Sequence, residues 1–222
     1  MNSIEYLYLV QHFLENSARR LPDKIALICD NQRLSYQQIN RLSDQMAACL
    51  IGMGIKRQDR VAIFLDNSVE SVISLFGVLK VGAIFIMLSA TMKAKKLNYI
   101  LNDSGAHVLV THTNKSRIVQ EAIKNSPDLE HIIWCTPRGS KKIPELQNTK
   151  HQTPNTKHHT FNEILSKHYT IHPIPYTNRC IDVDLSAIIY TSGSTGEPKG
   201  VMSAHYNMVA AACSITTYLE NT

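Results

Sequence analysis

The stretch Ala187–Val201, AIIYTSGSTGEPKGV, joins an apolar run to a cluster of glycines and small polar residues. The apolar run is typical of a buried strand. In Thr191–Gly196, glycines let backbone amides approach a ligand closely, and successive amides with hydroxyls form a concave site for anionic oxygens. Lys199 adds a point charge within reach of a phosphate. Because open α/β sheets bind ligands at the carboxyl ends of their strands, this stretch predicts a phosphate-binding loop there.

Two other phosphate-binding motifs do not fit this loop. A Walker A loop requires G-x-x-x-x-G-K-[ST], but the fifth residue after Gly193 is Pro198. The dinucleotide pattern G-x-G-x-x-G is absent as well, and Gly193 with Gly196 alone would be weak evidence. A flexible surface turn is the alternative for any Gly/Ser loop. The preceding strand and the following lysine favour the phosphate site.

Upstream of this loop, apolar strands alternate with helical patterns. Predicted strands begin near Arg60, Ala83, His107 and His131, roughly 23–24 residues apart. Strands separated by helices predict βαβ units, and strands that are apolar on both faces are buried between helix layers. The predicted fold class is therefore α/β, with a mostly parallel sheet layered with helices.

Helical spacing and capping residues place the helices. Ser35 is the predicted cap of a helix that ends at Gly52 or Gly54, and Asn67 is the predicted cap of the next. A short strand pair, KIALICD and RLSY, precedes Ser35 and turns at Asn31-Gln32. The other predicted helices are Tyr6–Arg20, Ser68–Val81, KAKKLNYILND, KSRIVQEAIKNS and FNEILSKH.

The composition excludes several classes of protein. With 222 residues, of which 44% are hydrophobic and 18% charged, the chain can bury a core in one or two domains. Wholesale disorder, collagen-like repeats and coiled coils are excluded. Five cysteines without CxxC spacing argue against a disulfide framework or a zinc site. The N-terminus lacks the layout of a signal peptide, so a cytoplasmic protein is expected.

The net charge of +5 is concentrated in one polar segment. Arg138–His159 contains five basic residues and one acid, which leaves about +1 for the rest of the chain. We expect residues 137–179 to form a polar, basic insert in which His158 and His159 lie in a solvated loop without a metal. A nucleic-acid binder would carry such charge on a face of its folded core, so nucleic acid is not an expected partner.

One apolar run is long enough to suggest a membrane span. Ser71–Leu88 contains a single charge, Lys80, over 18 positions. That lysine falls in the middle of the run, where insertion into a bilayer is unfavourable by about 2.5–3.5 kcal/mol. The run also changes at Gly82 from a helical pattern to a strand pattern. We therefore expect a helix followed by a buried strand, and no membrane span.

The signature YTSGSTGEPKGVM closely resembles the phosphate-binding signature of the AMP-forming, adenylate-forming enzymes. These include acyl- and aryl-CoA synthetases, peptide-synthetase adenylation domains and luciferases. Further elements resemble that family in the same order, over essentially residues 5–222: Leu34-Ser35-Tyr36, LKVGAIFIML from Leu79, LNYILNDSGAHVLVT from Leu97, Asp184-Leu185, and His205 with Asn207.

The resemblance implies a reaction and a set of site residues. A carboxylate attacks the α-phosphate of ATP, with Mg²⁺ as the metal, to give an acyl-adenylate and pyrophosphate; CoA or a carrier protein then accepts the acyl group. His205 would lie near the acyl pocket, or would only start a helix. The resemblance places the ATP phosphates on Thr191, Ser192, Gly193, Ser194, Thr195, Gly196 and Lys199.

Two departures from the family bear on this expectation. Met87 replaces a proline that follows the LKAG strand in relatives. Relatives also continue beyond this loop with adenine-, magnesium- and ribose-binding segments and a C-terminal domain with a catalytic lysine. The 222 residues therefore resemble an incomplete N-terminal portion of an acetyl-CoA-synthetase-like fold, a partial adenylation domain not expected to be catalytically complete.

Three functions remain open at this point. A CoA ligase is favoured, because the opening helix suits a free-standing enzyme. Loading of a carrier protein, as in peptide synthetases, is the second alternative. The third is a non-catalytic remnant or interaction module, which a complementing polypeptide would complete.

Overall fold

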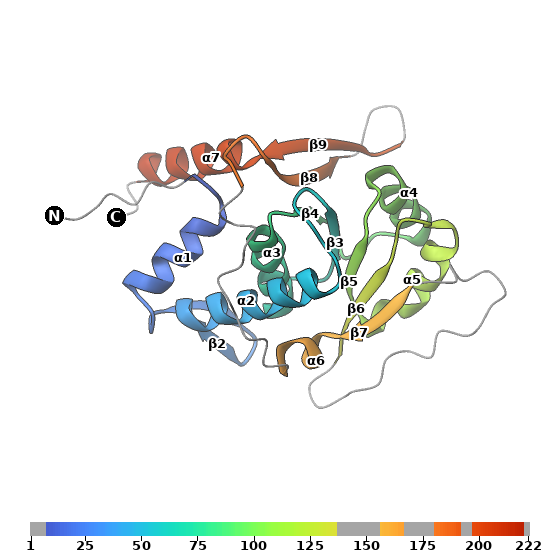
Figure 1. The fold of residues 1–222 in the computed structure, drawn as a ribbon, viewed down its shortest axis with the longest axis horizontal. Coiled ribbons are helices and arrows are strands. Elements are labelled where there is room, and N and C mark those ends of the chain that lie inside the picture. Colours follow the sequence, from blue (N-terminus) through green and yellow to red (C-terminus); the bar gives the residue numbers. More distant parts are fainter. Residues whose placement is uncertain (1–7, 137–155, 167–179, 192–196, 220–222) are drawn as a thin grey trace.

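The protein is seen in a computed structural model that describes residues 8–136, 156–166, 180–191 and 197–219. The described strands form a two-stranded antiparallel sheet, β1-β2, and a larger sheet in the order β7-β6-β5-β3-β4-β8-β9 (Figure 1). Neighbours in the larger sheet run parallel except β8 and β9. The strands are β1 Ile25–Cys29, β2 Gln32–Ser35, β3 Arg60–Phe64, β4 Ile84–Met87, β5 Val108–His112, β6 His131–Cys135, β7 Lys157–Thr160, β8 Leu185–Thr191 and β9 Lys199–Ala204.

Helices cover both faces of the larger sheet, as the strand sequences predict. In β3, Val61 and Ile63 pack toward α2 and α3, whereas Ala62 and Phe64 pack toward α4 and α5. Successive strand residues point to opposite faces, so a strand covered on both sides is apolar throughout. The helices are α1 Gln11–Arg20, α2 Tyr36–Gly52, α3 Val69–Val81, α4 Ala94–Ser104, α5 Ser116–Ala122, α6 Phe161–Ser166 and α7 His205–Tyr218, with short 3₁₀ turns η1 Thr113–Lys115 and η2 Ile123–Asn125.

One predicted helix cap is confirmed, and the predicted starts of two other helices need correction. Ser35 caps α2 through a complete capping box with Gln38, as predicted. The cap of α3 is Ser68 and not Asn67, because the Ser68 hydroxyl accepts a hydrogen bond from the Ser71 amide at 3.2 Å. The helix predicted from Tyr6 begins only at Gln11 among the described residues.

The apolar run Ser71–Leu88 is a helix followed by a strand, as predicted. α3 ends at Gly82, whose φ of 80° lies in the left-handed region that glycine adopts freely, and β4 follows. The Lys80 side chain is buried, and its Nζ lies 3.0 Å from Glu15 of α1 and 2.8 Å from Asp44 of α2. Among the described residues, no helix is long and apolar enough to cross a membrane.

The expectation of a solvated loop at His158 and His159 is wrong. Both belong to β7, which pairs with β6 at the edge of the sheet. The Trp134 indole donates to His158 Nδ1 at 2.9 Å, and His131 Nδ1 lies 3.0 Å from His159 Nε2. Backbone pairing with β6 and the hydrogen bonds of these two imidazoles hold this polar strand at the edge of the sheet. The rest of the predicted insert, 137–155 and 167–179, lies outside the described residues.

The contact between Trp134 and His158 predicts an acid-sensitive edge strand. Burial lowers the pKa of His158, so the neutral acceptor is favoured in the folded state. Its contribution to stability is complete above pH 6.5, the usual pKa of histidine, and is lost as the pH falls through the lower folded value. Trp134 is the sole tryptophan. We expect its fluorescence to shift to longer wavelength on acidification, before far-UV circular dichroism reports unfolding.

The matched variant for this titration is His158→Asn, whose amide oxygen replaces Nδ1 as the acceptor but does not titrate. The emission shift should disappear in this variant. An unchanged shift would show that another group controls the environment of Trp134.

Candidate functional site

The predicted phosphate-binding loop connects the two strands of an antiparallel hairpin. Thr191 is the last residue of β8 and Lys199 the first of β9, and the two are partners in the strand register. Both side chains are exposed. The expected site residues Ser192, Gly193, Ser194, Thr195 and Gly196 lie outside the described residues. The hairpin thus brings Thr191 and Lys199 together at the base of the loop.

The base of this loop lies beside the segment that follows β4. β8 runs parallel to β4, so both strands deliver their carboxyl ends to the same edge of the sheet. A cavity of about 500 Å³ lies between the hairpin and the start of α4. Three lysines and one acid are the charged groups that line it among the described residues, so its charge is predominantly positive. Its lining residues are Ser89, Thr91, Met92, Lys93, Lys95, Lys96, Glu197 and Pro198.

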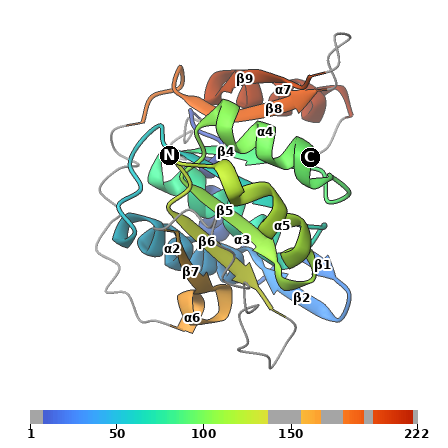
Figure 2. The ribbon, with the colours of Figure 1, turned by 90° about the vertical axis from the view of Figure 1, so that its right-hand side faces the viewer.

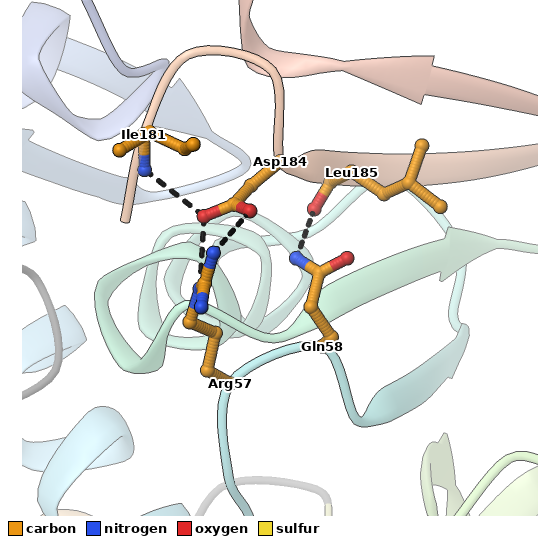
Figure 3. A network of polar contacts seen from close by, with 5 residues as sticks. All are labelled: Arg57, Gln58, Ile181, Asp184 and Leu185. Carbon is orange, nitrogen blue, oxygen red and sulfur yellow. Dashed lines mark hydrogen bonds and ion pairs between the residues drawn. The ribbon is translucent and has the colours of Figure 1, made fainter. Parts of the chain in front are cut away.

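A bidentate ion pair fixes the segment that leads into β8. Arg57 Nε lies 2.9 Å from Asp184 Oδ2, and Arg57 Nη2 lies 2.5 Å from Oδ1 (Figure 3). The Ile181 amide donates to Oδ2 at 2.9 Å. Burial acts to raise the pKa of Asp184, but the hydrogen bonds from Arg57 and Ile181 outweigh it, and the pKa lies below its usual value. Asp184 is therefore held as a carboxylate.

The residue after Arg57 adds a second link to the same segment. Gln58 Nε2 donates to the Leu185 carbonyl at 3.1 Å (Figure 3). The backbone N–H of Gln58 donates to the Gly82 carbonyl at 2.8 Å. Its φ of 67° is left-handed, which is unusual for a side chain of this size. Arg57 and Gln58 escaped the sequence analysis because they lie 127 residues from their partners and belong to no recognisable motif.

His205 begins α7 and is almost completely buried, with 1% of its surface exposed. The Val10 amide donates to its Nδ1 at 3.1 Å, and its own amide donates to the Asp184 carbonyl at 3.0 Å. Burial lowers the pKa of His205 to about 4, against a smaller opposing effect of Asp184; His12 adds to the decrease. The ring is a neutral acceptor that joins α7 to the start of α1 (Figure 1).

Comparisons with known proteins show the family to which the chain belongs. Residues 14–222 match the family described as AMP-binding enzyme. Bacitracin synthase 2 of Bacillus licheniformis is 30% identical over 200 residues, which are 90% of this chain and 6% of that protein. Tyrocidine synthase 1 of Brevibacillus parabrevis is 28% identical over 196 residues, which are 88% of this chain and 15% of that protein.

Solved structures show the same fold. An anthranilate CoA ligase in complex with anthranoyl-AMP superposes with a TM-score of 0.77 at 26% identity, over 90% of this chain and 35% of that one. A CoA ligase from Rhodopseudomonas palustris, described as a putative long-chain-fatty-acid ligase, superposes with a TM-score of 0.79 at 21% identity, over 98% of this chain and 49% of that one. At that identity the second likeness concerns the fold alone.

The fold is that of the N-terminal part of the adenylate-forming superfamily. The chain belongs to the AMP-binding enzyme family, as its signature predicted. It spans 15% or less of the two curated relatives above and about a third to a half of the two solved chains.

The buried histidine predicts how stability depends on pH in this part of the chain. In the unfolded chain His205 has a pKa near 6.5, so the unfolded state binds more protons below that pH, and acidification destabilises the fold. Between pH 7 and pH 5 we expect a loss of about 2 kcal/mol in the free energy of unfolding. Urea titrations at several pH values measure it.

His205→Asn keeps an acceptor for the Val10 amide and does not titrate, so its stability should fall less between pH 7 and pH 5 than that of the wild type. His112 also accepts a backbone amide at Nδ1, from a half-exposed position, and H112N is the matched control. An equal pH dependence in H205N and the wild type would contradict the assignment.

Proposed function

We propose that this chain carries the phosphate-binding part of an enzyme that activates a carboxylic acid with ATP. The carboxylate oxygen bonds to the α-phosphorus, the bond between the α-phosphorus and its bridging oxygen breaks, and pyrophosphate leaves. The β8–β9 hairpin supports this proposal most directly. It sets the Thr191 hydroxyl and the Lys199 ammonium on either side of a Gly/Ser loop, at the carboxyl end of a sheet strand.

The part played by these residues is electrostatic. An exposed ammonium at Lys199 attracts the β- and γ-phosphates, and the Thr191 hydroxyl donates a hydrogen bond to a phosphate oxygen. Holding the departing pyrophosphate oxygens in fixed positions lowers the barrier by orientation and charge stabilisation. Ser192–Gly196 would supply backbone amides to the same phosphates.

Magnesium would accompany ATP through its phosphate oxygens, where it would offset their charge. The described residues contain no group of three or more histidine, cysteine or carboxylate side chains that could hold a metal ion.

The second half of the reaction is transfer of the acyl group to a thiol. We favour CoA as the acceptor, supported by the likeness to a CoA ligase at 26% identity. Carrier-protein loading is the second candidate, because the signature also resembles peptide-synthetase adenylation domains and the curated relatives at 28–30% identity are tyrocidine synthase 1 and bacitracin synthase 2. His205 as an acyl-pocket residue remains a proposal within either scheme.

A binding measurement tests the role of Lys199. We expect the 222-residue chain to bind pyrophosphate in isothermal titration calorimetry, and Lys199→Ala to bind it about tenfold more weakly because one charge-assisted hydrogen bond is lost. Lys124→Ala, which removes an exposed lysine on η2, is the control and should bind like the wild type. Equal affinity of K199A and wild type would remove Lys199 from the site.

Carboxylate-dependent exchange of pyrophosphate into ATP tests the activity itself. The resemblance places the adenine and ribose contacts outside these residues, so we expect binding without exchange from the 222-residue chain. Robust exchange would contradict that expectation and make the chain sufficient for adenylation. A chain that binds no pyrophosphate would favour the non-catalytic module.

A further inference from the structure

Tyr190 immediately precedes the predicted phosphate-binding loop in the sequence. Its phenol donates a hydrogen bond to Asp103 Oδ2, with the two oxygens 2.5 Å apart. Asp103 lies in the last turn of α4, 87 residues earlier in the chain. In Figure 2 α4 runs alongside the hairpin of β8 and β9, so the contact links the end of β8 to the helix layer.

The partner strand leaves room for this tyrosine. Gly200 of β9 is the register partner of Tyr190. A Cβ at position 200 would lie 2.8 Å from Cγ2 of Ile188, closer than real Cβ contacts, and 3.2 Å from Cζ of Tyr190, which is tighter than most of them. The ring of Tyr190 therefore lies across Gly200. The Tyr190 side chain also packs against the apolar cluster formed with α4 and α5. A glycine at this position makes that close approach feasible.

Backbone pairing with β4 does not reach the end of the hairpin at Thr191 and Lys199. β4 and β8 share one register pair, Phe85 with Ala187, whereas β8 and β9 pair along their whole length. The hairpin therefore extends beyond its parallel neighbour. Side-chain contacts must fix the direction in which it points, and the Tyr190–Asp103 bond lies nearest to the loop among those described above.

The Tyr190 hydroxyl keeps its proton and remains a hydrogen-bond donor to Asp103. Burial first, and then the hydrogen bond with Asp103 and its charge, raise the pKa of Tyr190. The hydroxyl therefore stays protonated at neutral pH. The bond to a carboxylate is charge-assisted and stronger than a neutral one.

We propose that Tyr190 and Asp103 are positioning residues for Thr191 and Lys199 at the end of the β8–β9 hairpin: their hydrogen bond sets the direction in which β8 delivers Thr191, opposite Lys199, to a pyrophosphate group. This inference rests on the proposed function for the identity of the ligand. Neither residue needs to touch the phosphate.

Two measurements on the 222-residue chain test the proposal. In the free protein, Tyr190→Phe should raise the hydrogen exchange of the Thr191 and Lys199 amides while leaving β3 and β5 unchanged. In calorimetry with pyrophosphate, Y190F and Asp103→Asn should each weaken binding about five- to tenfold. The double variant should be no weaker than either single variant, because the two residues form one contact.

Tyr206→Phe removes the hydroxyl of an exposed tyrosine on α7 and is the matched control, expected to be unchanged in both measurements. Wild-type binding together with unchanged exchange and affinity in Y190F would overturn the proposal. Absence of pyrophosphate binding in the wild type would overturn the proposed function instead, and the exchange measurement would still decide whether Tyr190 and Asp103 orient the hairpin.

Discussion

The ion pair between Arg57 and Asp184 is the contact on which the arrangement of this chain depends. It joins the turn before β3 to the turn before β8, across 127 residues. β8 shares a single register pair with β4, so backbone bonding alone does not secure the hairpin to the parallel strands. Asp184 is mostly buried, and removing Arg57 would leave its carboxylate without its main partner.

Buried polar contacts also connect other segments that are distant in the sequence. Apolar layers hold the helices on the sheet, but they are non-directional and set no single orientation. Buried polar groups add direction at the joints. Lys80 connects α3 to α1 and α2 through Glu15 and Asp44, and His205 connects α7 to the start of α1. Each of these groups is costly to leave unpaired, so each favours one arrangement over its alternatives.

The parallel centre of the fold could be predicted because its strands are buried on both faces. Val61–Phe64 and Val108–Val110 are unbroken apolar runs, and the capping box of Ser35 gives the start of α2 directly. The edges could not be predicted in this way. Lys157–Thr160 has the composition of a loop, but backbone pairing with β6 and the contacts of His158 and His159 with Trp134 and His131 hold it as β7.

The candidate site was predictable in part, because two of its residues belong to a local sequence motif. Thr191 and Lys199 follow from the signature, and the structure adds that they are strand partners. The contacts that hold them, from Arg57, Gln58 and Asp103, are single long-range pairs with no local pattern. No periodicity or spacing in the sequence marks such pairs.

The most direct test of this account is hydrogen exchange of the β8 amides in Asp184→Asn, with Asp182→Asn as the matched control. If the Arg57–Asp184 pair holds the hairpin on the sheet, exchange in D184N should increase across β8 and β9 and stay unchanged in β3 and β5. D182N should behave as the wild type. Unchanged protection of β8 in D184N, or a uniform increase over the whole sheet, would contradict the account.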